Sequence, residues 1–169
     1  MKKLMAAAAL AVAMGAGTAV AQDFQPAVVF DMGGKFDKSF NEAAYNGAER
    51  FKKETGISYR EFEVTNEAQR EQAIRNMARR GANVIVGIGF AQETAMTKVA
   101  GEFPDTKFCI IDAVVKQPNV QSITFKEHEG SYLVGMAAAM ASKSGKVGFV
   151  GGMDIPLIRN FLTGYEQGV

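Results

Sequence analysis

Short apolar runs alternate with longer segments of helical periodicity through most of this chain. The runs AVVF, ISYREFEV, NVIVGIG, KFCIIDAVV, VQSITF and KVGFVGG have the length and composition of β-strands. Most of the segments between them place apolar residues every three or four positions, as amphipathic helices do. Strands that alternate with helices pair in parallel, because each helix carries the chain back to the same edge of the sheet. The sequence therefore predicts an α/β fold with a parallel sheet.

Four helices are expected between and after these strands. The first follows Ser39, which forms a capping box with Glu42, and it ends at Gly56. The second spans Asn66 to Arg80 and buries Ile74, Met77 and Ala78; the third spans about Gln92 to Gly101; the fourth spans about Lys126 to Ser142. The fourth contains YLVGMAAAMA, whose small residues favour close packing on a sheet.

The first 21 residues have the pattern of a secretory signal peptide. A basic start precedes an apolar, alanine-rich run that ends in Ala19-Val20-Ala21. This run is shorter than the roughly 20 apolar residues that span a bilayer, which argues against a retained anchor helix. Gln22 and Asp23 stand where a lipoprotein would carry its acylated cysteine. We therefore expect residues 1–21 to be removed and the mature protein to reside in the periplasm.

Charge and composition exclude several classes of function. The formal net charge is +1, and it becomes −1 without Lys2 and Lys3. Neither sign forms a long run, so nothing favours nucleic acid or an anionic membrane as a partner. Cys109 is the only cysteine and His128 the only histidine, which excludes a disulfide framework and disfavours a metal site or a histidine-dependent triad. We expect no enzyme activity and no cofactor.

Ligands of open parallel sheets bind at the carboxyl ends of the strands, so the residues after each apolar run are the candidates for a site. Four places qualify: Asp31 to Asn41, Gly87 to Glu93, Asp112, and Gly151 to Asp154. Neither VGIGF nor GFVGG completes the G-x-G-x-x-G pattern of a dinucleotide loop, because Gln92 occupies the third glycine position after Gly87 and Gly89. These glycines are better interpreted as tight turns.

The first of these places combines a turn with a helix start. Gly33 and Gly34 allow the backbone to turn after Asp31, and Ser39 caps the helix that begins with Phe40 and Asn41. The flat ring of Phe40 between polar Asp31 and Asn41 suits a planar ligand with polar edges, such as a nucleobase. The alternative is that Phe40 belongs to the core, since it shares a helical stripe with Ala44 and Phe51.

Asp112 follows the apolar segment FCII at a predicted strand end. A carboxylate at this position can accept hydrogen bonds from the hydroxyl groups of a sugar. The alternative is an aspartate that only stabilises a turn or caps a helix.

The segment DMGGKFDKSFNEAAYNG resembles the basic membrane protein family, the PnrA-like nucleoside-binding proteins of ABC importers. In that family an aspartate, paired glycines and D-x-S-F-N occur in this order. The similarity continues through ANVIVGIGF, FPDTKFCIID, FKEHEGSYLVGMAAA and GKVGFVGGMDIPLIRNFLTGYEQG, and it covers essentially all of the chain after the leader.

This resemblance implies one lobe of a two-lobed, type I periplasmic binding protein that closes on a purine nucleoside or a similar flat ring. It implies that Asp31, Phe40 and Asn41 contact the base and Asp112 the ribose region, with Gly33, Gly34 and Ser39 supporting the loop. The partners implied are the permease and ATPase subunits of an ABC importer, and the binding protein is expected to be a monomer.

The same resemblance implies that residues 22–150 form the N-terminal lobe and that residues 151–169 are the crossover and the start of a largely missing second lobe. Two alternatives stay open at this point. One is the ligand-sensing domain of a receptor, which would require an attached output domain. The other is a nucleoside-acting hydrolase or a dinucleotide-dependent oxidoreductase, which would require a clustered set of catalytic groups.

Overall fold

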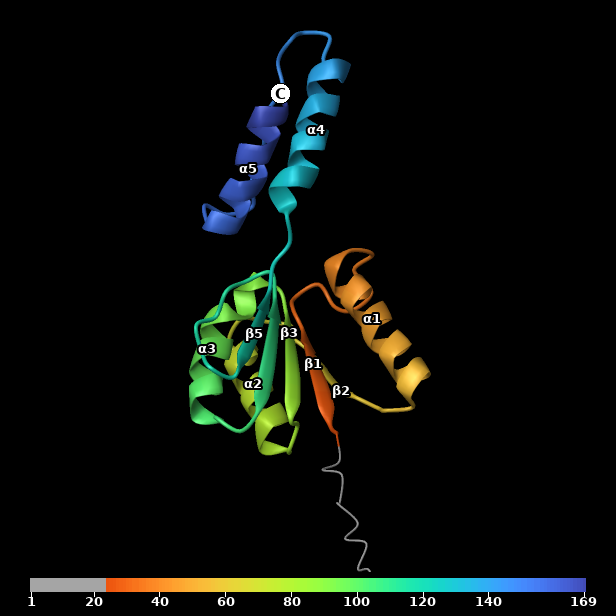
Figure 1. The fold of residues 1–169 in the computed structure, drawn as a ribbon, viewed down its shortest axis with the longest axis vertical. Helices are drawn as coiled ribbons and strands as arrows, with labels where there is room; N and C mark the ends of the chain where they lie inside the picture. The colour runs from red at the N-terminus through yellow and green to blue at the C-terminus, as the bar shows by residue number, and fades with distance from the viewer. Residues whose placement is uncertain (1–23) are drawn as a thin grey trace, which may run out of the picture.

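A parallel five-stranded sheet forms the centre of the structure, a computed structural model that describes residues 24–169 (Figure 1). Its strands are β1 (Pro26–Phe30), β2 (Arg60–Glu63), β3 (Val84–Ile88), β4 (Lys107–Ile111) and β5 (Val120–Ile123). They lie in the order β2-β1-β3-β4-β5, and every neighbouring pair is parallel. The predicted α/β fold is thus confirmed, while the expected signal peptide, residues 1–21, lies outside the described part of the chain.

The chain changes direction across the sheet at β1. From β1 it moves outward to β2, and from β2 it returns to β3 on the other side of β1. A crevice opens at such a point because the connections after the two central strands turn to opposite sides. This switch point lies between the carboxyl ends of β1 and β3.

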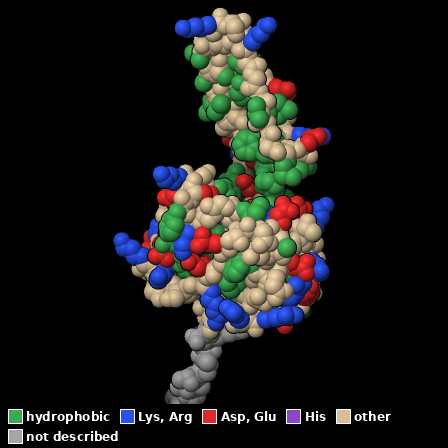
Figure 2. All heavy atoms as spheres, turned by 180° about the vertical axis from the view of Figure 1, so that it is seen from behind, with side chains coloured by type: hydrophobic (Ala, Val, Ile, Leu, Met, Phe, Trp, Pro, Cys, Tyr) green, Lys and Arg blue, Asp and Glu red, His purple; other side chains and the backbone are tan. Residues whose placement is uncertain are grey.

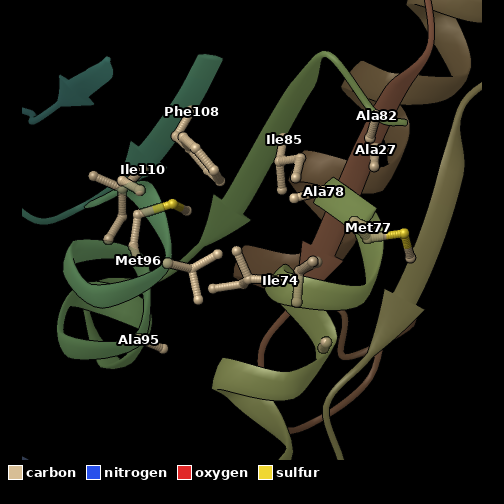
Figure 3. Packing of buried hydrophobic residues seen from close by; sticks show 14 of the residues in the cluster. Ala27, Ile74, Met77, Ala78, Ala82, Ile85, Ala95, Met96, Phe108 and Ile110 are labelled. Atoms are coloured by element: carbon tan, nitrogen blue, oxygen red, sulfur yellow. The ribbon is translucent and has the colours of Figure 1, made fainter. Parts of the chain in front are cut away.

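Helices cover the two faces of the sheet. Helix α1 (Phe40–Thr55) packs on one face, and α2 (Gln69–Arg79) and α3 (Glu93–Glu102) pack on the other (Figure 1). Successive strand residues point to opposite faces, so Val29 contributes to the α2 and α3 side and Val28 to the α1 side. Figure 3 shows the larger core, in which Ile74 and Met77 of α2 are buried as predicted.

The start of α1 differs from the predicted capping box. Ser39 makes no side-chain hydrogen bond to the helix. Instead, the Asp37 carboxylate accepts hydrogen bonds from the backbone N–H groups of Ser39, Asn41 and Glu42 at 2.8, 3.1 and 3.1 Å. Because both oxygens of Asp37 already occupy the free N–H groups of the first turn, the Ser39 hydroxyl has no donor left to serve.

Two further helices, α4 (Glu127–Ala141) and α5 (Pro156–Gly168), form a separate parallel pair beyond the carboxyl edge of the sheet (Figure 1). They approach so closely that a Cβ atom at Gly164 would overlap the carbonyl oxygen of His128, and one at Gly168 that of Tyr132. The range predicted for α4 is confirmed, but its predicted packing on the sheet is wrong. Of its small residues, Gly135 lies against α5 instead, where an added Cβ would overlap the carbonyl oxygen of Tyr165.

The predicted strand KVGFVGG is also absent from the described structure. Residues 146–150 have no regular secondary structure, and Val150 is 98% exposed. A strand forms only where a neighbouring backbone pairs with it, and no described strand lies beside this segment. Figure 2 shows hydrophobic side chains spread along the α4–α5 pair, whereas charged side chains gather over the sheet and its helices.

Among the helices of residues 24–169, none is long and apolar enough to cross a membrane. Cys109 is half-buried in β4, and burial raises the pKa of its thiol.

Candidate functional site

A cleft of about 910 Å³ lies between the carboxyl edge of the sheet and the first turns of α4 and α5. It sits at the switch point between β1 and β3, where ligands of open α/β sheets bind. Its lining comes from the segments after β1, β3, β4 and β5, from the start of α2 and α3, and from α4 and α5. The lining residues are Asp31, Met32, Glu67, Arg70, Phe90, Ala91, Glu93, Thr94, Asp112, Ala113, Val114, Thr124, Phe125, Glu127, His128, Met153, Ile155, Pro156, Leu157 and Asn160.

Asp31, the first residue after β1, is one of the two predicted site residues that line this cleft. Its Oδ1 accepts a hydrogen bond from Nε of Arg70 at 3.1 Å and forms an ion pair with Nη2 of the same side chain at 3.0 Å. Its Oδ2 lies against Gly89, where an added Cβ would stand 3.4 Å away. Gly89 also has a φ of 97°, so both its conformation and the nearby carboxylate favour glycine there.

Asp112, the other predicted residue in the cleft, follows β4 with a φ of 69°, an uncommon conformation for a residue other than glycine. Its backbone N–H donates to the carbonyl oxygen of Ile123 at 2.8 Å, which ties the turn to the end of β5. Burial and the nearby negative charge of Glu127 raise the pKa of Asp112 above its ordinary value. The cleft thus holds a carboxylate, Asp112, whose ionisation is disfavoured by burial and by a neighbouring negative charge.

Glu127, which sequence reasoning did not single out, stands at the start of α4. Its Oε1 accepts a hydrogen bond from Nδ2 of Asn160 in α5 at 2.7 Å. Its Oε2 is shielded from solvent and has no hydrogen-bond partner among the described residues. A shielded carboxylate oxygen without a donor is costly, so this atom favours a donor group arriving in the cleft.

Asn41 does not line the cleft but is built into its wall. The side chain is 3% exposed. Its Oδ1 accepts the backbone N–H of Asp31 at 3.1 Å, and its Nδ2 donates to the carbonyl oxygens of Asp31 and Met32 at 3.2 and 3.5 Å. The amide therefore joins the first turn of α1 to the end of β1 and sets the backbone from which the Asp31 carboxylate projects.

Phe40 lies at the first position of α1 and is 38% exposed, outside both the buried core and the residues that line the cleft. Ala44, on the same stripe, does pack against the buried cluster on the α1 face. The ring of Phe40 is therefore free on part of its surface, near the cleft wall that Asp31 and Asn41 form.

The glycine-rich turn before α1 is anchored to β2. Gly33 and Gly34 have φ values of 109° and 76°. The backbone N–H of Lys35 donates to Oε2 of Glu63 at 2.9 Å, and its ammonium group pairs with Glu61. The same ammonium lies 5.1 Å from the centre of the Tyr45 ring. Although its composition is typical of a solvated loop, this turn is thus fixed by ionic and cation–π contacts.

Arg70, Glu127 and Asn160 are functional candidates that sequence reasoning missed. Each is carried by a helix, and whether it faces a cleft depends on how that helix is rotated. One signal was present for Arg70: helices that follow parallel strands begin at the carboxyl edge, so residues in their first turn lie near the site.

The cleft is rich in carboxylates. It is lined by five acidic residues but by only one arginine, Arg70; the acids are Asp31, Glu67, Glu93, Asp112 and Glu127. Within residues 24–169, no group of three or more His, Cys, Asp or Glu side chains is placed to hold a metal ion. Carboxylates are acceptors of hydrogen bonds, so this lining suits a ligand that presents N–H and O–H donors.

This chain is similar to known proteins over most of its described length. Residues 24–169 match the family described as ABC transporter substrate-binding protein PnrA-like. The chain is 36% identical over 161 residues to the ABC transporter nucleoside-binding protein BmpA of Lactococcus lactis subsp. cremoris, covering 92% of this chain and 46% of that protein. It is 36% identical over 154 residues to the CD4+ T-cell-stimulating antigen of Listeria monocytogenes, covering 88% and 43%.

Solved structures share the fold. An ABC transporter solute-binding protein from Aeropyrum pernix K1 superposes with a TM-score of 0.76 at 35% identity, over 86% of this chain and 42% of that one. A 5-methylthioribose transporter solute-binding protein from Thermotoga lettingae superposes with a TM-score of 0.66 at 17% identity, over 87% and 47%. The chain spans less than half the length of the curated relatives it matches. By the match over residues 24–169 and these identities, the chain belongs to the PnrA-like family of ABC transporter substrate-binding proteins.

Proposed function

We propose that this chain forms the first lobe of an extracytoplasmic substrate-binding protein that captures a purine nucleoside, or a similar flat ring ligand, for an ABC importer. The observation that carries the proposal is the pair Asp31 and Asp112 in one cleft at the sheet's switch point. The nucleoside class is supported by the name of the Lactococcus relative, which is a nucleoside-binding protein.

The charge of the cleft supports a nucleoside over a nucleotide. Five carboxylates against one arginine repel a phosphate group, whereas a nucleoside presents neutral hydroxyl and N–H donors. In this proposal the ribose hydroxyls donate to Asp112, and the unpartnered Oε2 of Glu127 accepts a further donor. The raised pKa of Asp112 fits a carboxyl that gains its donors only when the ligand is bound.

The base is proposed to lie between Asp31 and the start of α1. Asp31 accepts an N–H group of the base through Oδ2, and the ring stacks on the partly exposed face of Phe40. The contact of Asn41 with the base that the resemblance implies is limited to the second lone pair of Oδ1, because the side chain is 3% exposed and its N–H groups donate to the carbonyl oxygens of Asp31 and Met32. The supporting turn of Gly33, Gly34 and Ser39 holds this wall in place.

The family and the leader sequence suggest the biological setting. A binding protein of an ABC importer acts outside the cytoplasmic membrane and delivers its ligand, chemically unchanged, to permease and ATPase subunits. We propose that it does so as a monomer in the periplasm.

Isothermal titration calorimetry of the protein with adenosine, guanosine and inosine tests the proposal, with the matching monophosphates as controls. We expect saturable heat with at least one nucleoside and much weaker binding of its monophosphate. The absence of heat and of a thermal shift with every nucleoside would contradict the purine assignment. Chromatography of the same mixtures tests the hydrolase alternative, since a hydrolase would release free base and a binding protein would not.

A further inference from the structure

Arg70 is the only arginine among the residues that line the cleft, and its side chain is 11% exposed. Two of its nitrogens approach the same oxygen of Asp31, Oδ1: Nε donates a hydrogen bond at 3.1 Å, and Nη2 forms an ion pair at 3.0 Å. Its third nitrogen, Nη1, stands 3.9 Å from Oε1 of the exposed Glu67. The two shortest contacts of the guanidinium are therefore both with one oxygen of Asp31, a residue proposed to bind the ligand.

The position of Arg70 is fixed by the start of α2. Oε1 of Gln69 accepts hydrogen bonds from the backbone N–H and the hydroxyl of Thr65 at 2.9 and 3.0 Å, which ties the first residue of the helix to the segment after β2. One turn further on, Ile74 is fully buried against the sheet. The helix cannot rotate without exposing this side chain, so the guanidinium is held at the carboxyl end of β1.

We infer that Arg70 is a positioning residue that acts on the ligand through Asp31. By contacting Oδ1 with two nitrogens, one through a hydrogen bond and one through an ion pair, it leaves Oδ2 as the acceptor that faces a ligand and holds the carboxylate in one rotamer. Asp31 then takes a single N–H or O–H donor from the ligand, rather than the paired donors that a free carboxylate can bind through both oxygens. This inference rests on the proposed function, because it requires Asp31 to touch the ligand.

The experiment is a double-mutant cycle on the nucleoside that binds best, with affinities measured by calorimetry for wild type, Arg70→Gln, Asp31→Asn and the double variant. We expect each single variant to lose about tenfold or more in affinity, as for a misplaced charge-assisted hydrogen bond. The double variant should be no weaker than Asp31→Asn by more than about twofold, because residues that act through one contact are not additive.

Arg75→Gln is the matched control. Arg75 lies on the same helix and donates to Glu102 at 2.6 Å, but it does not line the cleft. Its replacement should lower the melting temperature and leave affinity unchanged. A loss of affinity for Arg70→Gln with a folded circular dichroism spectrum, absent in Arg75→Gln, separates positioning from general stability. Arg70→Lys, which keeps the charge but cannot place two nitrogens on Oδ1, should fold and still bind more weakly than wild type.

The outcomes distinguish this inference from the function on which it rests. Wild-type protein that binds no nucleoside overturns both. Wild-type protein that binds, while Arg70→Gln or Arg70→Lys binds equally well, overturns only the role of Arg70. Losses that add in the double variant show that Arg70 acts independently of Asp31, which also overturns the inference.

Discussion

The buried amide of Asn41 hydrogen-bonds to both the backbone N–H and the backbone carbonyl of Asp31, so the first turn of α1 and the end of β1 form one rigid unit. Replacing Asn41 by Ala leaves these backbone groups without partners in a buried place. We expect Asn41→Ala to lower the free energy of unfolding by about 1–3 kcal/mol in denaturant titrations.

Asn46→Ala is the control for this change, because Asn46 is exposed in the middle of the same helix. Alanine is a better helix former than asparagine, so this control should be neutral or slightly more stable. Equal stability of the two variants would show that the Asn41 amide does not hold the wall together.

Asp37 is the true cap of α1, and its removal should destabilise the helix more than the removal of Ser39. The three backbone N–H groups that it accepts outweigh the opposing effect of desolvation and hold the pKa of Asp37 below its ordinary value. A lowered pKa in the folded state contributes stability above the pKa of the unfolded chain, about 3.9. That contribution is lost as the pH falls through the lowered value.

Thermal melts of Asp37→Ala and Ser39→Ala at several pH values check this prediction. Asp37→Ala should melt below wild type at pH 7, and the gap should narrow as the medium becomes acidic. Ser39→Ala should melt close to wild type, since its hydroxyl makes no capping bond. A lower melting temperature for Ser39→Ala than for Asp37→Ala would instead support the capping box that the sequence pattern predicts.

How far the sequence predicts this molecule depends on whether a feature is local. The strands from Pro26 to Ile123 and the ranges of the first four α-helices follow from periodicity and turn residues, and Asp31 and Asp112 are found because each follows a buried strand. The contacts of Arg70 and Glu127 depend on how helices sit against the sheet, which no short pattern encodes.

The segment 146–150 is a case in which a local pattern predicts a strand that does not form. KVGFVGG has the composition of a strand, yet strand formation depends on a neighbouring backbone and not on composition alone. The small residues of α4 likewise predict close packing but not the partner. In the structure that partner is α5, which begins at Pro156, and the sheet is left without contact from most of α4.

Asp112→Asn should make the protein more stable at neutral pH. Burial and the charge of Glu127 raise the pKa of Asp112, so the folded state binds its proton more tightly than the unfolded chain. Such a group stabilises the fold when protonated, and that stability is lost as the pH rises from about 3.9 through the raised folded value. Asparagine carries no charge and also tolerates the positive φ of this position.

Melting temperatures of wild type and Asp112→Asn between pH 4 and pH 8 test this sign. The advantage of the variant should be small at the acidic end and should grow as the pH rises until it levels off. An advantage independent of pH would assign the effect to backbone conformation alone. Ligand affinity should fall in the same variant, because the carboxylate is proposed to accept donors from ribose.

Phe40→Ala separates a stacking role from a packing role. If a base stacks on the exposed face of Phe40, the substitution should cost about 1–3 kcal/mol of binding free energy, as base–aromatic stacking does elsewhere. Stability should change little, because the ring is 38% exposed.

Calorimetry and thermal melts are compared on the same samples. Phe36→Ala is the control, because the ring of Phe36 lies in the neighbouring turn and is 66% exposed. A fall in stability with unchanged affinity per folded molecule would make Phe40 a core residue.

The close approach of α4 and α5 depends on glycines that have no room for a side chain. A methyl group at Gly164 would overlap the carbonyl oxygen of His128, which is backbone and cannot swing aside. The two helices would have to separate along their length. This separation would also disturb the part of the cleft wall that Asn160 and Glu127 form.

We expect Gly164→Ala to lower the free energy of unfolding by about 1–3 kcal/mol or more, as overpacking does in other cores. Gly130→Ala is the control, because Gly130 lies in α4 with nothing within 4 Å of an added Cβ, so it should gain helix stability instead. If both variants unfold alike in denaturant, the helices are not in contact through Gly164, and the cleft lacks the wall on which the placement of Glu127 depends.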